Sequence, residues 1–452
     1  MQSSIQTFEV TSLELPSSES IRDHVITALS CYWYKNYAAV KQLPIAQIEL
    51  LSINGPLRLA EVKLPNWASR WGINGSLLVP IEAIKSGEKS VIDWESVDWW
   101  LAAFLLLEAW HERAWEIQYG PIHSYSNRLN GWDQRAWQYA WVNRIGLFLR
   151  DWAAYQFNGD AASYLGALPQ SKVHLTHDVD AVNKTVPIRL KQGAFIFFNA
   201  FKSLRFGRFQ SAIKQIQQAT RFLFCRDDWW TFGQLQLWES VAGIHATYHF
   251  HANYPPKTFQ KWLFDPSYDI AAPKQQALLR QLIGQGHTIG LHPSFDTWKD
   301  SAKIALLRSK VEQAAGVLVT HCRQHWLRFS WQETWRAQQS AGLTHDTTLM
   351  FNDRAGFRNS SALRWHPWQV QSDDKFNLVV MPSVFMDSHF YDYQQMSPVD
   401  RRSAMQHWIQ ECHSVSGEAA ILWHPHTLTR DYGWVDGFKD VIQLIKESEV
   451  CR

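Results

Sequence analysis

The chain of 452 residues is long enough for two or three domains of ordinary size. With 46% hydrophobic and 19% charged residues, its composition indicates a folded globular protein with a large core. The formal net charge of +2 gives no global attraction to nucleic acid, and no nucleic-acid-binding motif is found, so we expect no nucleic-acid partner.

The cysteines and the N-terminal residues predict a cytoplasmic protein. The first residues lack the basic start and apolar stretch of a secretory signal. The longest apolar run, Trp99 to Leu107, is too short to span a bilayer, so we expect no transmembrane segment. Five scattered cysteines without a CxxC pair do not suggest a disulfide framework and suit a reducing compartment: Cys31, Cys225, Cys322, Cys412 and Cys451.

Residues 1–165 form one compositional unit, which we predict to be a smaller α/β domain. The sequence does not indicate its role. From Val91 to Phe157 the unit becomes helical and rich in tryptophan. Earlier, alternation of apolar and polar residues indicates short strands near Ile5, Phe8, Val10, Ile48, Leu50 and Leu57.

Within this unit, the stretch LLLEAWHERAW places Glu108, His111 and Glu112 at helical spacings. Such a set could bind a metal ion, but we favour a charged, exposed helix face. The chain also contains 25 tryptophans. Exposed tryptophans can serve as stacking platforms for sugars, although we expect most of them to lie in the core or partly buried.

From Ser171 onward, short apolar segments alternate with amphipathic helical patterns. Such repeats predict a mainly parallel sheet, here a barrel, with the chemistry at the carboxyl ends of the strands. We predict strands at 172–176, 244–250, 287–292, 323–329, 377–382 and 419–424. The helices are expected near 232–242, 274–285, 300–315, 331–340, 397–413 and 436–448.

Residues 181–226 interrupt this alternation, and we predict an insertion near 181–230. The segment 181–226 contains nine Lys or Arg, eight Phe and no Asp or Glu. This mixture is typical of an interfacial helix that contacts a membrane surface or a glycolipid. A helical flap that packs its phenylalanines on the barrel is the interpretation we favour.

The run Thr-His-Asp-Val-Asp at 176–180 follows the apolar residues Val173 to Leu175. If these residues form a strand, Asp178 and Asp180 point to the same side. Two close carboxylates ionise together only when a cation or an arginine lies between them. The run therefore suits a metal site with an adjacent general base, although an Asp-rich turn with solvated side chains is the alternative.

Four later segments carry polar clusters after apolar stretches. GHTIGLHPSFD at 286–296 supplies His292, Ser294 and Asp296, and CRQHWLRF at 322–329 supplies Arg323 and His325. A single histidine in such a place is usually structural. Several clusters at strand ends are harder to dismiss. The remaining two segments contain Asp346, Asp353 and Arg358, and His424 and His426.

At these motifs the chain resembles the NodB-homology polysaccharide deacetylases, which remove acetyl groups from sugars. THDVD resembles a variant of that family's first motif in which the second Asp follows two residues after the first. GHTIGLH resembles the strand and the first histidine of the second motif. Arg323 resembles the arginine of the third motif, and Leu422-Trp423-His424 resembles the final Leu-x-His. The resemblance covers about 170–430 and is closest to bacterial members with a separate N-terminal domain.

The resemblance implies an α/β fold, a deformed (β/α) barrel over 166–452 preceded by the smaller domain of 1–165. It also implies roles for individual residues. Asp178 resembles the general base that activates water, and Asp180 and His292 resemble ligands of a divalent metal, expected to be Zn²⁺. Arg323 would pair with Asp178 and keep it charged. His424 resembles the general acid that protonates the leaving group.

One departure from the family pattern concerns the metal. The second motif usually presents His-x-x-x-His, and Asp296 stands in place of the second histidine. We expect either an Asp-His-Asp site with Asp296 as third ligand, or weak or absent metal binding. His249 and His251 are spare ligand candidates. The candidate substrate contacts are His177, His249, His251, His325, Asp346, Arg358, Trp423 and His426.

The expected function is the metal-dependent removal of an acetyl group from an N- or O-acetylated sugar of a glycan or glycan precursor. A carbohydrate-binding protein built on a degenerate deacetylase barrel is one alternative. Hydrolysis of a non-sugar amide or cyclic ureide is another, because fold analogy does not separate these activities.

Overall fold

The computed structural model describes residues 13–45, 53, 55–85, 92–225, 227–256, 258–394 and 396–450. The strands predicted at Ile5, Phe8, Val10, Ile48 and Leu50 lie outside these residues. The chain divides into two compact units. The first comprises Met1–Val173, Trp326–Phe385 and His407–Ala420, and the second His174–His325, Met386–Gln406 and Ile421–Arg452. The predicted domain boundary at residue 165 stays a prediction.

The first unit is built around the fully buried helix α3 (Trp99–Leu107). Its sequence WWLAAFLLL is apolar on all sides, which is typical of a core helix. Asp98 caps its N-terminus by accepting from the backbone N–H groups of Trp100 and Leu101. The other elements of this part of the chain are α1 (Ser18–Ala28), α2 (Tyr37–Lys41), the antiparallel pair β1 (Leu59–Lys63) and β2 (Ser76–Pro80), α4 (Trp110–Tyr119), α5 (Trp141–Gln156) and α6 (Ala161–Leu165).

The charged residues that follow α3 are buried, so the prediction of an exposed charged face is wrong. Glu108, His111 and Glu112 are 0%, 3% and 3% exposed. Each has a charged partner: Glu112 pairs with Arg358, and His111 Nε2 lies 3.3 Å from Glu82. The three do not form a metal site either, because the one candidate group among the described residues lies elsewhere.

Glu108 is the centre of a buried polar network in this unit. One carboxylate oxygen contacts His24 Nε2 at 2.8 Å and accepts from Trp365 Nε1 at 3.0 Å. The other accepts from Arg113 at 2.6 Å and from the backbone N–H of Trp368 at 3.0 Å. A buried carboxylate with four donors satisfies its hydrogen-bonding needs, and it also neutralises the buried guanidinium.

We expect Glu108→Ala to lower the free energy of unfolding by about 3–5 kcal/mol, because it leaves the buried Arg113 without its carboxylate. Chemical denaturation followed by circular dichroism measures this change. The control is Glu95→Ala, an exposed residue of the same unit, for which we expect a change within about 0.5 kcal/mol. Equal effects of the two substitutions would contradict a structural role for Glu108.

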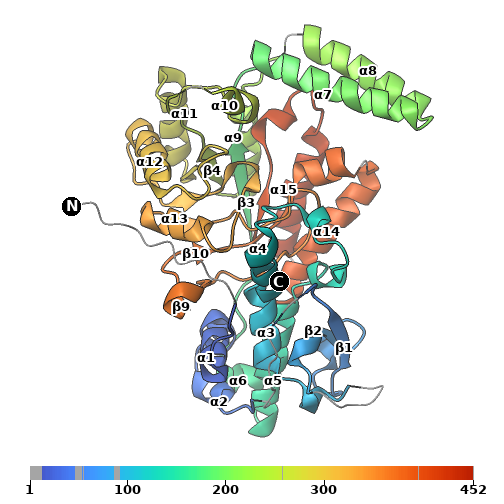
Figure 1. The fold of residues 1–452 in the computed structure, drawn as a ribbon, viewed down its shortest axis with the longest axis vertical. Helices are drawn as coiled ribbons and strands as arrows, with labels where there is room; N and C mark the ends of the chain where they lie inside the picture. Colours follow the sequence, from blue (N-terminus) through green and yellow to red (C-terminus); the bar gives the residue numbers. More distant parts are fainter. Residues whose placement is uncertain are drawn as a thin grey trace. The chain divides into compact units, whose positions relative to one another are not determined.

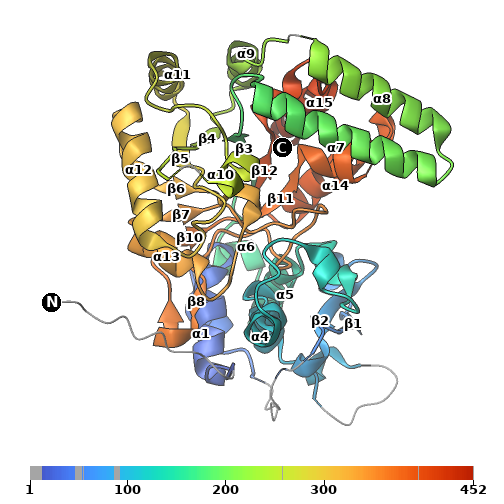
Figure 2. The same ribbon diagram turned by 45° about the horizontal axis from the view of Figure 1, so that its top comes forward.

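The main sheet has eight strands in the order β10-β7-β6-β5-β4-β3-β12-β11 (Figures 1 and 2). Its pairs β3–β4, β4–β5, β5–β6 and β7–β10 are parallel. The predicted α/β fold with a mainly parallel, curled sheet is confirmed. The strands are β3 (Lys172–Val179), β4 (Thr247–Phe250), β5 (Thr288–Leu291), β6 (His321–Cys322), β7 (His345–Asp346), β10 (Val379–Val380), β11 (Ser383–Met386) and β12 (Glu418–Leu422). A separate antiparallel pair is formed by β8 (Trp368–Gln369) and β9 (Asp374–Lys375).

The helices of this part of the chain match the predicted ranges closely. They are α9 (Phe232–Ala242), α11 (Pro273–Gly284), α12 (Ser301–Ala315), α13 (Thr334–Ser340), α14 (Pro398–Ser414) and α15 (Val435–Val450). The predicted insertion is also helical. It contains α7 (Val186–Arg205) and α8 (Phe209–Phe224), which lie side by side in Figures 1 and 2, and the short α10 (Phe259–Phe264) follows later in the chain.

In the main sheet one predicted strand is wrong and two strands are missed, and the pair β8 and β9 was not predicted either. No strand forms at 323–329: β6 ends at Cys322, and Trp326 and Leu327 have φ angles of +57° and +49°. Left-handed backbone at two successive residues cannot continue a strand. The strands β7 and β11 were not predicted. β7 has two residues, and Pro382 separates β11 from β10, so neither shows a clear alternating pattern.

Most tryptophans lie in the interior, as expected. Among all 25, which fall within the described residues, Trp262 and Trp326 are the two exposed ones. In the part of the chain that the structure describes, no helix combines the length and the apolar character needed to cross a membrane.

Candidate metal and catalytic site

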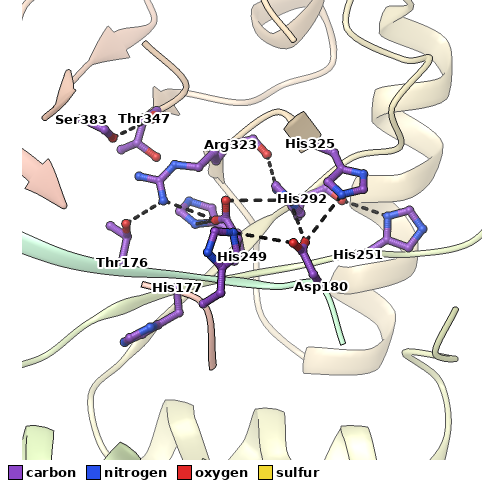
Figure 3. A network of polar contacts seen from close by, with 12 residues as sticks. Thr176, His177, Asp180, His249, His251, His292, Arg323, His325, Thr347 and Ser383 are labelled. Atoms are coloured by element: carbon purple, nitrogen blue, oxygen red, sulfur yellow. Dashed lines mark hydrogen bonds and ion pairs between the residues drawn. The ribbon is translucent and has the colours of Figure 1, made fainter. Parts of the chain in front are cut away.

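The polar residues at the carboxyl ends of the strands meet in the second unit. Asp178 is near the end of β3, and Asp180 follows that strand. His249 is in β4, His292 directly follows β5, and Arg323 directly follows β6. Because neighbouring parallel strands end at the same edge of a sheet, these side chains are brought close together (Figure 3). The expected same-side placement of the two aspartates follows from the alternation along β3.

Asp178 is a buried carboxylate with three basic neighbours. Its Oδ1 lies 3.3 Å from Arg323 Nη1 and 3.2 Å from His249 Nδ1, and its Oδ2 lies 3.8 Å from His292 Nε2. Burial by itself would raise the pKa of Asp178, but the charges of His292 and Arg323 hold it well below its usual range. The carboxylate is therefore ionised, which a proton acceptor requires. Arg323 is held in turn by Thr176, whose hydroxyl accepts from Nη1 at 2.6 Å.

Three side chains form a group that could hold a metal ion, namely Asp180, His292 and His325. Oδ1 of Asp180 lies 3.3 Å from His292 Nε2 and 3.6 Å from His325 Nε2. Both imidazoles are oriented through their other nitrogen. Nδ1 of His292 donates to the Arg323 carbonyl at 2.7 Å, and Nδ1 of His325 lies 3.3 Å from Asp265 Oδ1. This support of the far nitrogen is typical of metal-binding histidines, because it leaves Nε2 as a lone-pair donor.

The donor set fits a divalent ion. One carboxylate and two imidazoles are the ligands that Zn²⁺ and similar ions prefer. Oδ1 of Asp180 is a buried atom that has no hydrogen-bond partner among the described residues. A buried carboxylate oxygen without a donor is costly unless a cation compensates it. The group thus provides both the ligand types and a carboxylate oxygen that receives no hydrogen bond from the described residues.

His424 and Asp387 form a hydrogen-bonded pair next to Asp180. His424 follows β12, and its Nε2 is 3.6 Å from Asp180 Oδ2. Its Nδ1 lies 2.8 Å from Oδ1 of the fully buried Asp387, whose Oδ2 accepts from the His424 backbone N–H at 2.8 Å. Burial disfavours the imidazolium, but the charge of Asp387 outweighs this and raises the pKa of His424 to about 10. His424 is therefore protonated at neutral pH and can donate a proton from Nε2.

The predicted third ligand, Asp296, is not part of this candidate group, which contains His325 instead. Both carboxylate oxygens of Asp296 accept from the phenol of Tyr254, at 2.7 and 2.9 Å. His325, which was predicted as a substrate contact, is oriented by Asp265 toward Asp180.

The two spare histidines of β4 differ in their surroundings. His249 contacts Asp178, and burial lowers its pKa to about 4, so the ring is neutral. Its ring is accommodated by Gly290 in the adjacent strand, since a Cβ there would lie 2.5 Å from His249 Cδ2. His251 is also buried, with Nδ1 at 3.2 Å from the His292 carbonyl. It therefore supports the backbone of His292, and it is not in the metal-ligand group.

Three other predicted substrate contacts of this unit are engaged or buried. His177 points away from Asp180 (Figure 3), and its ring nitrogens contact the Trp423 carbonyl at 2.6 Å and Glu239 at 2.7 Å. Trp423 is fully buried and packs on Phe438. His426 is half-buried and stacks on Trp229. Contacts within the protein therefore occupy much of all three side chains.

The two predicted contacts of the first unit belong to its own polar networks. Asp346 accepts from the side chains of Trp335, Gln338 and Thr348. Arg358 pairs with Glu112. Both residues are almost completely buried, at 1% and 3% exposure, which leaves little surface for a substrate.

Sequence reasoning missed two residues that orient the site. Asp387 directly follows the apolar stretch Val384 to Met386. Polar residues in the same position after the other strands are predicted site residues, so a predicted strand at 383–386 would have made Asp387 a candidate as well. Asp265 follows the short α10 and carries no comparable signal. Its contact with His325 depends on the folding of the chain between them.

No known family model matches the sequence, and no curated protein is similar to it. Solved structures with a related fold include a candidate polysaccharide deacetylase from Mycobacterium smegmatis, at 15% identity over 62% of this chain and 86% of that one, with a TM-score of 0.36. Another is a candidate polysaccharide deacetylase involved in O-antigen biosynthesis from Bordetella bronchiseptica, at 14% identity over 57% and 72% of the chains, with a TM-score of 0.29.

A third structure is a CE4-family pseudoenzyme from Bacillus anthracis, at 12% identity over 62% of this chain and 61% of that one, with a TM-score of 0.26. At such identities and TM-scores the likeness carries no argument about this chain. The function therefore has to be argued from the geometry of the site.

We expect the purified protein to bind one divalent ion per chain, and His292→Ala and His325→Ala to lose it, because each removes a ligand. Elemental mass spectrometry after equilibrium dialysis against Zn²⁺ gives the stoichiometry. Asp296→Asn is the matched control and keeps the metal. Loss of metal in Asp296→Asn with retention in His325→Ala would show that the ligand set is instead Asp180, His292 and Asp296.

Proposed function

We propose that this protein is a metal-dependent hydrolase that removes an acetyl group from an N- or O-acetylated sugar of a glycan or glycan precursor. The observation that carries the proposal is the arrangement around Asp180. An ionised carboxylate, Asp178, and a protonated imidazole, His424, flank a group of metal-binding side chains. A base, an acid and a metal ion together are sufficient for acyl hydrolysis without a covalent nucleophile.

Asp180, His292 and His325 would hold the ion. When bound, it would polarise the acetyl carbonyl and stabilise the negative charge that develops on its oxygen. The fit rests on the buried, donor-free Oδ1 of Asp180 and on the two imidazoles with their Nδ1 atoms engaged.

Asp178 is the proposed general base. Its carboxylate accepts a proton from water as the water oxygen forms a bond to the acetyl carbon. Arg323 and His249 orient the carboxylate, and the charges of His292 and Arg323 keep it ionised before the reaction. Because Arg323 acts through Asp178, it is a positioning residue in this scheme.

His424 is the proposed general acid. Its Nε2 proton goes to the nitrogen or oxygen of the sugar as the bond to the acetyl carbon breaks, so the products are acetate and a free amine or hydroxyl. Asp387 holds Nδ1 and stabilises the imidazolium before the transfer. Opposite charge states of two neighbouring groups, set by separate partners, give a base and an acid at the same pH.

The acetylated sugar substrate is inferred from the resemblance of the motifs, and the similar solved structures include proteins described as polysaccharide deacetylases. The site geometry alone is equally suited to other amides and esters. Acetate release from acetylated sugars is therefore the direct assay for this part of the proposal.

We expect Asp178→Asn to lower kcat for acetate release by about 10²- to 10⁴-fold, because the amide cannot accept the proton of water. Metal stoichiometry and the thermal unfolding temperature should stay close to those of the wild type. Asp269→Asn, at an exposed aspartate of the same unit, is the control and keeps full activity. Normal turnover in Asp178→Asn would refute the role of this residue. Sugar binding without acetate release by the wild type would favour a binding protein.

We expect Asp387→Asn to lower kcat by roughly 10²-fold while leaving KM and metal content nearly unchanged, because it removes the partner that orients His424 and stabilises its imidazolium. Steady-state kinetics combined with elemental mass spectrometry separates the two effects. If Asp387 were merely structural, unfolding temperature and KM would change together with kcat.

A further inference from the structure

The helices α7 and α8 each carry two apolar stripes. In α7 the packed stripe comprises Gly193, Ile196, Ala200 and Ser203, at spacings of three and four residues. It meets α8, because a Cβ at Gly193 would lie 2.7 Å from Leu223 and the Ser203 hydroxyl lies 2.9 Å from Gln215. The corresponding packed stripe of α8 comprises Ala212, Gln215, Ala219 and Phe222.

The second stripe of each helix is exposed. In α7 it comprises Val186, Leu190, Phe197, Phe201 and Leu204, whose exposure ranges from 40% to 67%. In α8 it comprises Phe209, Ile213, Ile216 and Phe224, between 39% and 78% exposed. Large side chains in a regular helical stripe normally face a packing partner. Such a concentration on one hairpin marks an interaction surface.

The two exposed stripes lie on the same side of the hairpin. In α7, Phe197 and Phe201 directly follow the packed residues Ile196 and Ala200. In α8, Ile213 likewise follows Ala212. An antiparallel helix pair has a two-fold axis perpendicular to the plane of its helices. Residues that come one position after the packed stripe therefore point to the same side of the hairpin in both helices. The stripes form one continuous apolar face, which we call the hairpin face.

The charge around the hairpin face has a single sign. Residues 186–224 contain seven Lys or Arg and no Asp or Glu. Five of these basic residues are exposed, and several come one position after the exposed apolar stripe, at its outer border: Lys202, Arg205, Arg208, Lys214 and Arg221. An apolar stripe bordered by basic residues is the pattern of a helix that lies in a lipid interface.

The short helix α10 extends this surface. Lys191 of α7 donates to the carbonyls of Trp262 and Leu263, at 2.7 and 3.0 Å. Trp262 and Phe259 of α10 are 45% and 75% exposed. Tryptophan is favoured at the boundary between lipid and water, where its ring is partly buried and its N–H stays hydrated.

We propose that the hairpin face docks this protein on an anionic lipid surface. Charge complementarity selects this occupant over a second copy of the chain, because two such faces would bring fourteen cationic side chains together without a carboxylate from either hairpin. On a membrane the phenylalanines enter the interface, while the lysines and arginines reach the phosphate groups. The proposal stands independently of the hydrolase activity.

The hairpin is anchored to the body of its unit on the opposite face. Ile196, Ala219 and Phe222 form a buried cluster with Ala181 and Trp229. At its base, Lys184 and Asp431 form a buried ion pair at 2.7 Å, and Asp431 also accepts from Trp229 Nε1 at 2.8 Å. The hairpin face is therefore a surface fixed to the protein.

The test is binding of the full-length protein to vesicles of phosphatidylglycerol and phosphatidylcholine in equal parts, measured by co-sedimentation. We expect binding that weakens as salt is raised and is weak on pure phosphatidylcholine. The double variant Phe201→Asp, Ile213→Asp changes one exposed residue in each helix and should lower the partition coefficient at least about tenfold. Its helix content should be unchanged by circular dichroism.

The control is the double variant Leu237→Asp, Leu318→Asp, which changes two residues of the same unit that are 59% and 69% exposed but lie outside the hairpin. It should bind vesicles like the wild type. Equal loss in both double variants, or no vesicle binding by the wild type, would overturn the proposal. A dimer seen by light scattering that only the hairpin variant breaks, without vesicle binding, would assign the face to a second copy. Asp178→Asn should bind vesicles normally, which separates docking from catalysis.

Discussion

The arrangement of the site depends on two carboxylates that the alternation of β3 places on the same side. Asp178 and Asp180 are two residues apart, and a parallel sheet offers no other direction for either side chain. Their mutual repulsion has to be balanced by positive groups. Arg323 lies against Asp178, and His292 lies near both carboxylates. The basic residues at the neighbouring strand ends are thus required by the charge at the end of β3.

This balance also separates the two carboxylates chemically. Asp178 has an arginine close by and keeps its charge without a metal ion. Asp180 has only imidazoles nearby, and its Oδ1 receives no hydrogen bond from the described residues. The first environment favours a proton acceptor and the second favours a cation ligand. His424 obtains the opposite property, a retained proton, from Asp387. Three neighbouring groups therefore suit the three proposed roles, because each has a different partner.

The hairpin face and the site are connected through one packed cluster. Trp229 packs in the cluster below the hairpin and stacks on His426, with ring centroids 5.7 Å apart. His426 in turn lies next to His424, with ring centroids 5.6 Å apart. The buried cluster below the hairpin therefore contacts His426, which lies beside the proposed general acid. The sequence separates them, since the hairpin precedes His424 by about two hundred residues.

Short-range sequence patterns were enough to locate most of the site. Alternation in THDVD placed the two aspartates, and strand ends placed His292, Arg323 and His424, because strand periodicity and the common edge of a parallel sheet are local or repetitive features. The sequence also predicted the helices of 181–226 and showed the excess of basic residues in this segment. These features depend on residues that are close in sequence or on a rule that applies to every strand.

Which side chains contact each charged residue, in contrast, was decided only by the tertiary structure. His325 reaches Asp180 because Asp265, sixty residues away, holds its ring, while Asp296 is occupied by the phenol of Tyr254. Glu108 is buried because His24 and Arg113 neutralise it, although its helical spacing resembled an exposed face. The strand expected at 323–329 did not form, and two residues within that range adopt positive φ angles. Residue type and spacing fix which chemistry is available. Long-range packing fixes which side chains meet, because a charge can be buried only beside the partner that the fold brings to it.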